Sequence, residues 1–112
     1  METEKLFSSY SKFESWIINN KEKVSSYVMK NDVYLSDIMS ARAYNVMRIN
    51  QIQKMSDIIF ISFDEISGFY MMDKNVLNEV LMFKRNFLRK NKRDIIMFIS
   101  GNNDGKRKNP QR

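Results

Sequence analysis

The chain contains no cysteine and no histidine among its 112 residues. Without cysteine there is no disulfide framework, no thiolate metal site and no cysteine nucleophile. Without histidine the chain lacks the commonest metal ligand, the commonest general base and the usual pH switch. Catalytic triads built on histidine are therefore excluded. We expect a protein that is not an enzyme and that holds neither a metal ion nor a cofactor.

Long hydrophobic runs are absent as well. The two longest, at residues 58–63 and 95–99, fall far short of the ~20 apolar residues that span a bilayer. The first five residues are mixed in charge, which is not how a secretory signal begins. We therefore expect a small soluble protein with no membrane span, located in the cytoplasm, or inside a host cell if its source is viral.

The composition favours one folded domain. Hydrophobic residues make up 43% of the chain and aromatic residues 12%, which is too apolar for an intrinsically disordered protein. The length suits a single domain with its own core. Residues 101–112 hold two glycines, a proline and no apolar side chain. We expect a globular domain over residues 1–100 and a disordered basic tail over residues 101–112.

Apolar residues recur at helical spacing in three parts of the chain. The first part is residues 3–30, which forms one long helix or, if Asn19-Asn20 breaks it, two short helices. The second runs from Ser36 to about Met55, and the third from about residue 73 to residue 91 with Asp73 as its N-cap. The pattern predicts about three helices.

Short runs dense in isoleucine and phenylalanine occupy residues 57–62 and 94–100. Such runs are typical of strands buried on both faces. With residues 33–35 as a third strand, the chain would form a small α/β unit with two or three short parallel strands. The alternative is an all-α domain, but the β-branched residues favour strands. Buried strands would make Ile59→Ala and Ile96→Ala each cost about 2 to 5 kcal/mol.

Positive charge is concentrated at the end of the chain. Residues 1–82 hold nine basic and eleven acidic residues, whereas residues 83–112 hold ten basic and two acidic ones. A basic helix face followed by a basic arm can track phosphates. The predicted nucleic-acid contacts are Arg85, Arg89, Lys92, Arg93, Lys106, Arg107 and Lys108. A merely solvated charged face, an anionic membrane surface and an acidic partner are the alternatives.

A second candidate surface is apolar. Phe69, Tyr70, Met71 and Met72 follow one another in a predicted loop. Four large apolar side chains there must either tuck under the domain or form an exposed patch, and a patch would mark a partner site. This segment supports the alternative hypothesis of a protein-binding adaptor or an inhibitor of a larger complex.

Carboxylates suggest two resemblances to enzymes. Asp64-Glu65 after an apolar run resembles the magnesium-side motif of P-loop ATPases, but the chain has no Gly-x-x-x-x-Gly-Lys-Ser/Thr segment to cradle phosphates. The placement of Glu79 resembles that of the glycosidic-bond-cleaving carboxylate in TIR and nucleoside-deoxyribosyltransferase type domains. That resemblance implies a nucleotide-processing enzyme, although the chain is too short for the full sheet of those domains.

Because the concentration of positive charge is the clearest signal in the sequence, the leading hypothesis is a non-enzymatic, nucleic-acid-binding accessory protein.

Overall fold

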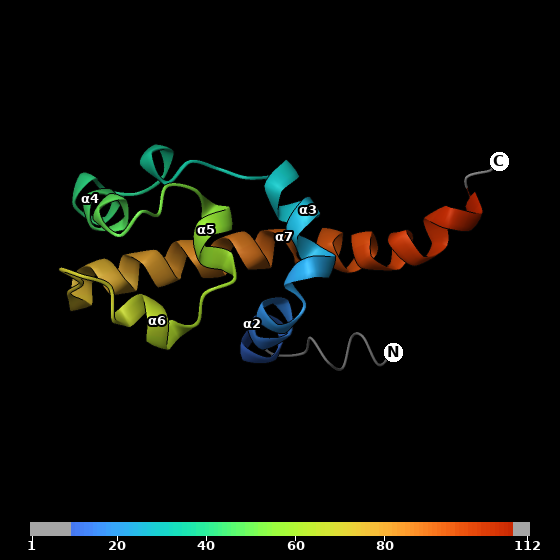
Figure 1. Cartoon of the computed structure of the whole chain (residues 1–112), viewed down its shortest axis with the longest axis horizontal. Helices are drawn as coiled ribbons and strands as arrows, with labels where there is room; N and C mark the ends of the chain where they lie inside the picture. Colours follow the sequence, from blue (N-terminus) through green and yellow to red (C-terminus); the bar gives the residue numbers. More distant parts are fainter. Residues whose placement is uncertain (1–9, 109–112) are drawn as a thin grey trace.

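A computed structural model describes the backbone of residues 10–108 and the side chains of residues 10–100. Its elements are α2 (Tyr10–Asn19), α3 (Lys21–Lys30), the 3₁₀ helix η1 (Leu35–Asp37), α4 (Ala41–Ile49), α5 (Met55–Ile59), α6 (Phe63–Ser67) and α7 (Lys74–Lys108). The long helix α7 is the axis along which α2 to α6 pack (Figure 1). The predicted disorder of residues 101–112 stays a prediction: α7 runs to Lys108, and residues 109–112 lie outside the described part.

The described chain is all-α, so the α/β prediction is wrong and its all-α alternative is correct. Between residues 10 and 108 the only strand-like pairing is an isolated antiparallel bridge between Tyr34 and Lys54. The predicted strand at 57–62 belongs to α5 and the turn after it, and the one at 94–100 lies inside α7. Residues 33–35 lead through the bridge into η1.

Capping groups explain why the run at 57–62 is not a strand. A carboxylate oxygen of Asp57 accepts the backbone N–H groups of Gln53 and Lys54, both at 3.0 Å, at the start of α5. Shortly after α5 ends, Ser62 and Glu65 form a reciprocal capping box that begins α6. Satisfying the open N–H groups at each helix start stabilises two short helices here. A count of apolar residues alone does not register these caps.

The run at 94–100 continues the buried stripe of α7. Ile95 is fully buried whereas Met97 is 59% exposed, and a strand buried on both faces would cover both. The buried positions of α7 follow one another at intervals of four or seven residues, as Val76, Val80, Lys84, Leu88 and Ile95. This spacing is that of a single helix face. No glycine or proline interrupts α7 before Gly101, so the helix continues through the isoleucines.

The helix boundaries agree with the sequence in two places. Of the two alternatives for residues 3–30, the structure shows the break at Asn19-Asn20, because α2 ends at Asn19 and the Asn20 side chain donates to the carbonyl of Trp16 at 2.8 Å. Asp73 caps the last helix as predicted, accepting the N–H of Val76 at 2.8 Å. The predicted second helix, from Ser36 to about Met55, is instead divided into η1 and α4, and Ser40 rather than Ser36 caps α4.

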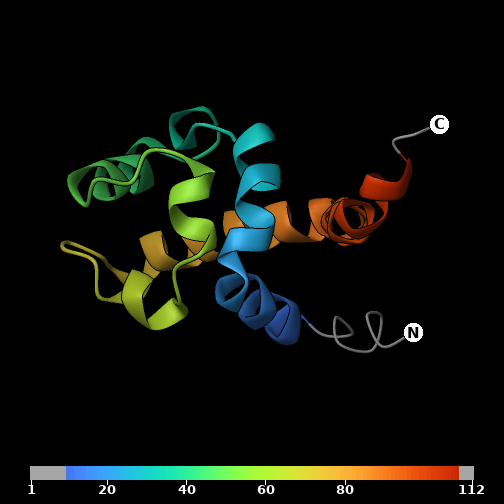
Figure 2. The ribbon, with the colours of Figure 1, turned by 45° about the vertical axis from the view of Figure 1, so that its right-hand side comes forward.

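Helix α7 contacts every other α-helix of the described chain. In Figure 1, α3, α4 and α5 lie on one side of it and α2 and α6 on the other. Figures 1 and 2 both show the far end of α7 extending past α2 and α3. The molecule therefore has one end where α7 is surrounded and one end where it projects.

Candidate functional site

The predicted phosphate contacts lie on one side of α7. Arg85, Arg89 and Arg93 are exposed, and Lys92 is half-buried. At 3.6 residues per turn these four positions fall within about one third of the helix circumference. Lys106, Arg107 and Lys108 belong to the backbone of α7, but their side chains lie outside the described part.

Two of these cations pack on aromatic rings of α2. The guanidinium carbon of Arg85 lies 4.9 Å from the ring centroid of Tyr10, and the Lys92 ammonium lies 5.7 Å from that of Phe13. Both distances are typical of cation–π contacts. Burial, together with the neighbouring carboxylate of Glu14, raises the pKa of the Tyr10 hydroxyl. Helix α2 thus packs beside the basic residues of α7, and its Tyr10 ring positions Arg85.

Arg89 and Arg93 form no ion pair with any residue that the structure describes. Lys90 is exposed beside them, and Asp94 is the one acidic residue between positions 83 and 100. Unpaired charges of one sign on neighbouring turns add up to a local positive potential. The surface formed by Arg85, Arg89 and Arg93 is called the basic face below.

Lys84 precedes the basic face in sequence but does not contribute to it. Its side chain is fully buried, and its Nζ donates to Glu14 Oε2 and to the carbonyl oxygen of Ile61, each at 2.6 Å. The ammonium therefore ties α2 and the turn after α5 to α7. The sequence held a signal for this, because Lys84 stands four residues from both Val80 and Leu88 on the buried stripe.

The predicted partner loop is divided by the structure. Phe69 and Met72 are half-buried and pack against the core, whereas Tyr70 is 70% exposed and Met71 is 61% exposed. The side chain of Asn50 holds Tyr70: its Oδ1 accepts the Tyr70 N–H at 2.9 Å, and its Nδ2 donates to the Tyr70 carbonyl at 3.0 Å. Sequence reasoning missed Asn50, because a contact across twenty residues leaves no local pattern.

Backbone strain gathers at the same place. Gln51 and Met71 have positive φ angles of 66° and 63°, and each directly follows one member of the Asn50–Tyr70 pair. Left-handed backbone is unfavourable for residues with a side chain and persists only where surrounding contacts impose it. The Asn50 hydrogen bonds supply such contacts. The side chains of Tyr70 and Met71 are consequently presented on a fixed backbone.

Glu79, the candidate catalytic carboxylate, and Asp73 each hold the start of a helix. Both oxygens of Glu79 accept hydrogen bonds from Ser40, one from its N–H at 2.6 Å and one from its hydroxyl at 2.8 Å. Asp73 caps α7 and forms an ion pair with Arg42. Within the residues described, no three acidic side chains come together as a metal site would require. Glu79 thus has a structural role at α4, and its proposed chemical role stays a prediction.

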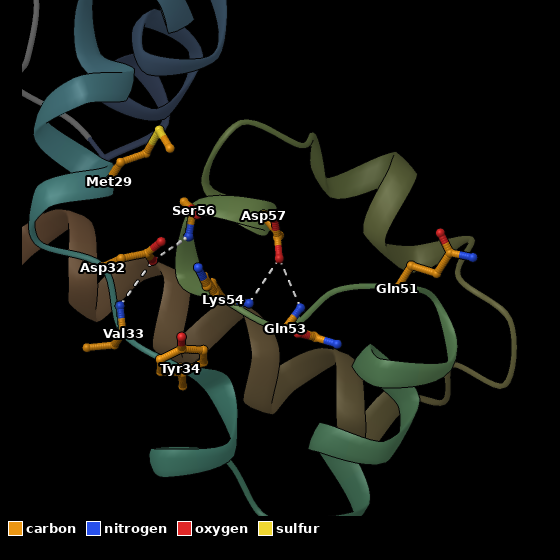
Figure 3. Close-up of a pocket in the computed structure, with 9 residues that line it drawn as sticks. All are labelled: Met29, Asp32, Val33, Tyr34, Gln51, Gln53, Lys54, Ser56 and Asp57. Carbon is orange, nitrogen blue, oxygen red and sulfur yellow. Dashed lines mark hydrogen bonds between the residues drawn. The ribbon is translucent and has the colours of Figure 1, made fainter.

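A hollow of about 490 Å³ lies between the end of α3 and the start of α5 (Figure 3). An Asp32 oxygen there accepts the N–H groups of Val33 and Ser56 at 3.0 and 2.9 Å. The Lys54 ammonium lies 5.3 Å from the ring centroid of Tyr34. Asp32 and Asp57 thus satisfy backbone groups of this junction. The hollow lies where the loop after α3 meets the loop before α5, and none of the basic-face residues lines it.

No protein-family model matches the chain, and searches of curated proteins and of solved structures found no match. In the part of the chain that the structure covers, no helix combines the length and the apolar character needed to cross a bilayer. Functional inference therefore depends on the residues of this chain alone.

Proposed function

We propose that this protein binds nucleic acid through phosphate contacts made by the basic face of α7. The observation that carries the proposal is the exposure of Arg85, Arg89 and Arg93 on one side of a helix, with no ion pair to any described residue. Guanidinium groups suit this role, because their planar N–H groups can bind phosphate oxygens in pairs.

The distribution of charge over the molecule supports the same proposal. At the surrounded end of α7, the acidic residues Asp64 and Glu65 of α6 are exposed and Asp73 neutralises Arg42. The far half of α7 carries the excess of basic residues. An approaching polyanion is attracted to one end of the molecule and repelled from the other. Such an arrangement orients the basic face toward the phosphates.

Fluorescence anisotropy with a labelled oligonucleotide over a salt series tests this function. The variant Arg89→Gln with Arg93→Gln removes two exposed charges that have no structural partner in the described chain. We expect weaker binding to every sequence and a salt slope that is smaller by about two, because each phosphate contact contributes about 0.9 to that slope.

The matched control is Lys30→Gln with Arg48→Gln, which removes two exposed charges from α3 and α4. Its net charge equals that of the test variant, so the control separates a local contact from general attraction. We expect the control to retain most of the affinity. No binding by the wild-type protein at low salt, or equal losses in the two variants, would reject the proposed surface.

Protein binding through Tyr70 and Met71 is the second candidate function. The supporting observation is that these exposed side chains stand on a strained backbone held by Asn50. Tyrosine is enriched at the centres of protein interfaces, and methionine adapts to varied partners. A pre-positioned pair would lose little conformational entropy on binding.

Affinity capture from lysate tests this second function. Tyr70→Ser with Met71→Ser should abolish capture of any specific partner, while Met82→Ser, another exposed methionine on α7, should leave it unchanged. Equal capture by the wild-type protein and the Tyr70/Met71 variant would exclude the loop as the binding surface.

A further inference from the structure

The basic face lies on the exposed side of α7 and not in a groove. Arg89 and Arg93 are exposed on the stretch of α7 against which α2 and α3 pack, because Lys92 lies over the Phe13 ring and Tyr27 donates to Asn91. Helix α7 then continues past α2 and α3 (Figures 1 and 2). The described hollow between α3 and α5 is lined by none of the basic-face residues. A convex, positively charged helix is complementary to a concave, negatively charged surface. A single strand, in contrast, is usually held in a positively charged groove.

Exposed aromatic rings are missing from the basic face. Over residues 10–100 the large exposed apolar side chains of α7 are Met82 and Met97, and the exposed rings, Tyr34, Phe63 and Tyr70, belong to other segments. The rings of Tyr10 and Phe13 lie beneath Arg85 and Lys92. Proteins that bind single strands stack the bases on exposed aromatic rings. The described basic face offers phosphate contacts without such a platform.

The dimensions of the projecting helix suit a groove. Ile99 is the last residue of α7 in the described part that packs against the core, and the helix continues for nine residues to Lys108. At 1.5 Å per residue this is about 14 Å of helix. The sequence of residues 101–108 contains two asparagines, two lysines and one arginine, together with Asp104 and two glycines. Asparagine, lysine and arginine are residue types that contact base edges and phosphates.

We propose that the nucleic acid is double-stranded DNA and that the far half of α7 (residues 89–108) enters its major groove, with the basic face on the bordering phosphates. This inference rests on the proposed function. The major groove of B-form DNA is about 12 Å wide and admits an α-helix. The major groove of A-form RNA is too deep and narrow for one. The same helix therefore distinguishes DNA from RNA duplexes.

The test is a direct comparison of three labelled probes of equal length and sequence: double-stranded DNA, double-stranded RNA and single-stranded DNA. Full-length protein is titrated into each at one salt concentration, and anisotropy is measured. We expect double-stranded DNA to bind at least about tenfold tighter than either of the other probes. Arg89→Gln with Arg93→Gln should weaken binding to the DNA duplex, with circular dichroism as the check that the variant remains helical.

A fourth probe tests the groove itself. It is the same DNA duplex with bulky sugar substituents at the 5-position of its cytosines, which fill the major groove and leave the phosphates unchanged. The protein should bind this substituted duplex about tenfold or more weakly than the unmodified duplex.

Different results reject the groove inference and the proposed function. Equal binding to single-stranded DNA or to double-stranded RNA, or undiminished binding to the substituted duplex, would overturn the groove inference and leave phosphate binding standing. No binding to any probe at low salt would overturn the proposed function as well.

Discussion

The two halves of α7 differ in what surrounds them. In the near half (residues 74–88), α4, α5 and α6 cover the helix and the buried positions are Val76, Val80, Lys84 and Leu88. In the far half, as far as Ser100, Ile95 is the one fully buried residue. Lys84, on the buried stripe of the near half, is held by internal contacts, whereas Arg89, Lys90 and Arg93 of the far half are exposed.

This contrast separates stability from binding within one helix. Substitutions in the near half remove packing and buried polar contacts, so they should change the free energy of unfolding. Substitutions of Arg89 and Arg93 remove exposed charges that form no ion pair with a described residue, so they should change affinity and leave stability nearly constant. The following predictions test that division, beginning with the largest expected effect.

The strongest test of the near half is the buried ion pair. Glu14→Ala leaves the Lys84 ammonium buried, with the Ile61 carbonyl as the acceptor that remains among the described residues. An uncompensated buried charge is unfavourable, so the free energy of unfolding should fall by about 3 kcal/mol. Urea denaturation followed by circular dichroism measures the change.

A double variant serves as the control for this ion pair. Glu14→Leu with Lys84→Met replaces both charges by apolar groups of similar size, and it should recover most of the lost stability. A double variant that is less stable than Glu14→Ala would show that the charges themselves stabilise the junction.

The position of the last core contact is tested by two neighbouring isoleucines. Ile95 is fully buried and Ile96 is half-buried. Ile95→Ala should cost about 3 kcal/mol, and Ile96→Ala about 1 kcal/mol, when unfolding is followed in urea. Equal costs at the two positions would contradict the helical geometry of this segment, since a strand buried on both faces covers both residues alike.

Alkaline pH tests the contact between α2 and the basic face. Burial raises the pKa of the Tyr10 hydroxyl above its ordinary value of 10.0. The unfolded chain therefore releases this proton at lower pH than the folded chain does. The contribution of the neutral Tyr10 hydroxyl to the free energy of unfolding is fully present below about pH 10. It is lost as the pH rises further.

The measurement is the free energy of unfolding in urea from pH 8 to pH 11. Tyr10→Phe should show a shallower decline above pH 10 than the wild-type protein shows. Parallel curves for the two proteins would mean that Tyr10 is no more buried in the folded state than in the unfolded one.

The smallest expected effect lies outside α7, in the Tyr70 loop. Met71→Gly removes the side chain from a residue whose φ is 63°. Glycine adopts this backbone without strain but gains entropy in the unfolded chain. The free energy of unfolding should therefore rise by about 0.5 kcal/mol in Met71→Gly. A thermal melt that shows a clear loss would mean that the Met71 side chain packs more favourably than its exposure indicates.

Helix positions were predictable where local signals agreed. The break at Asn19-Asn20 and the cap at Asp73 were found because asparagine and aspartate act on neighbouring backbone groups. The two isoleucine-rich runs were misassigned because a short apolar run has the same composition in a buried strand and in a buried helix. Ile95 and Met97 differ in burial only because α3 and the core lie on one side of α7.

The candidate surfaces were predictable in part. A count of charges located the basic residues, and a loop prediction located Tyr70 and Met71. Neither showed that Lys84 is buried against Glu14, which stands seventy residues earlier, or that Asn50 clamps Tyr70. Contacts of this kind join distant segments and follow only from the packing of the whole chain.

The sequence by itself determined that this protein has no thiol or imidazole chemistry and that its positive charge gathers at one end, because composition and order do not depend on folding. The tertiary structure decided which charges remain available. Arg89 and Arg93 stand on the exposed side of α7, and Lys84 points into the core. The physical reason is the helical period: residues five positions apart occupy different faces, and packing against α2 and α5 selects the face that is buried.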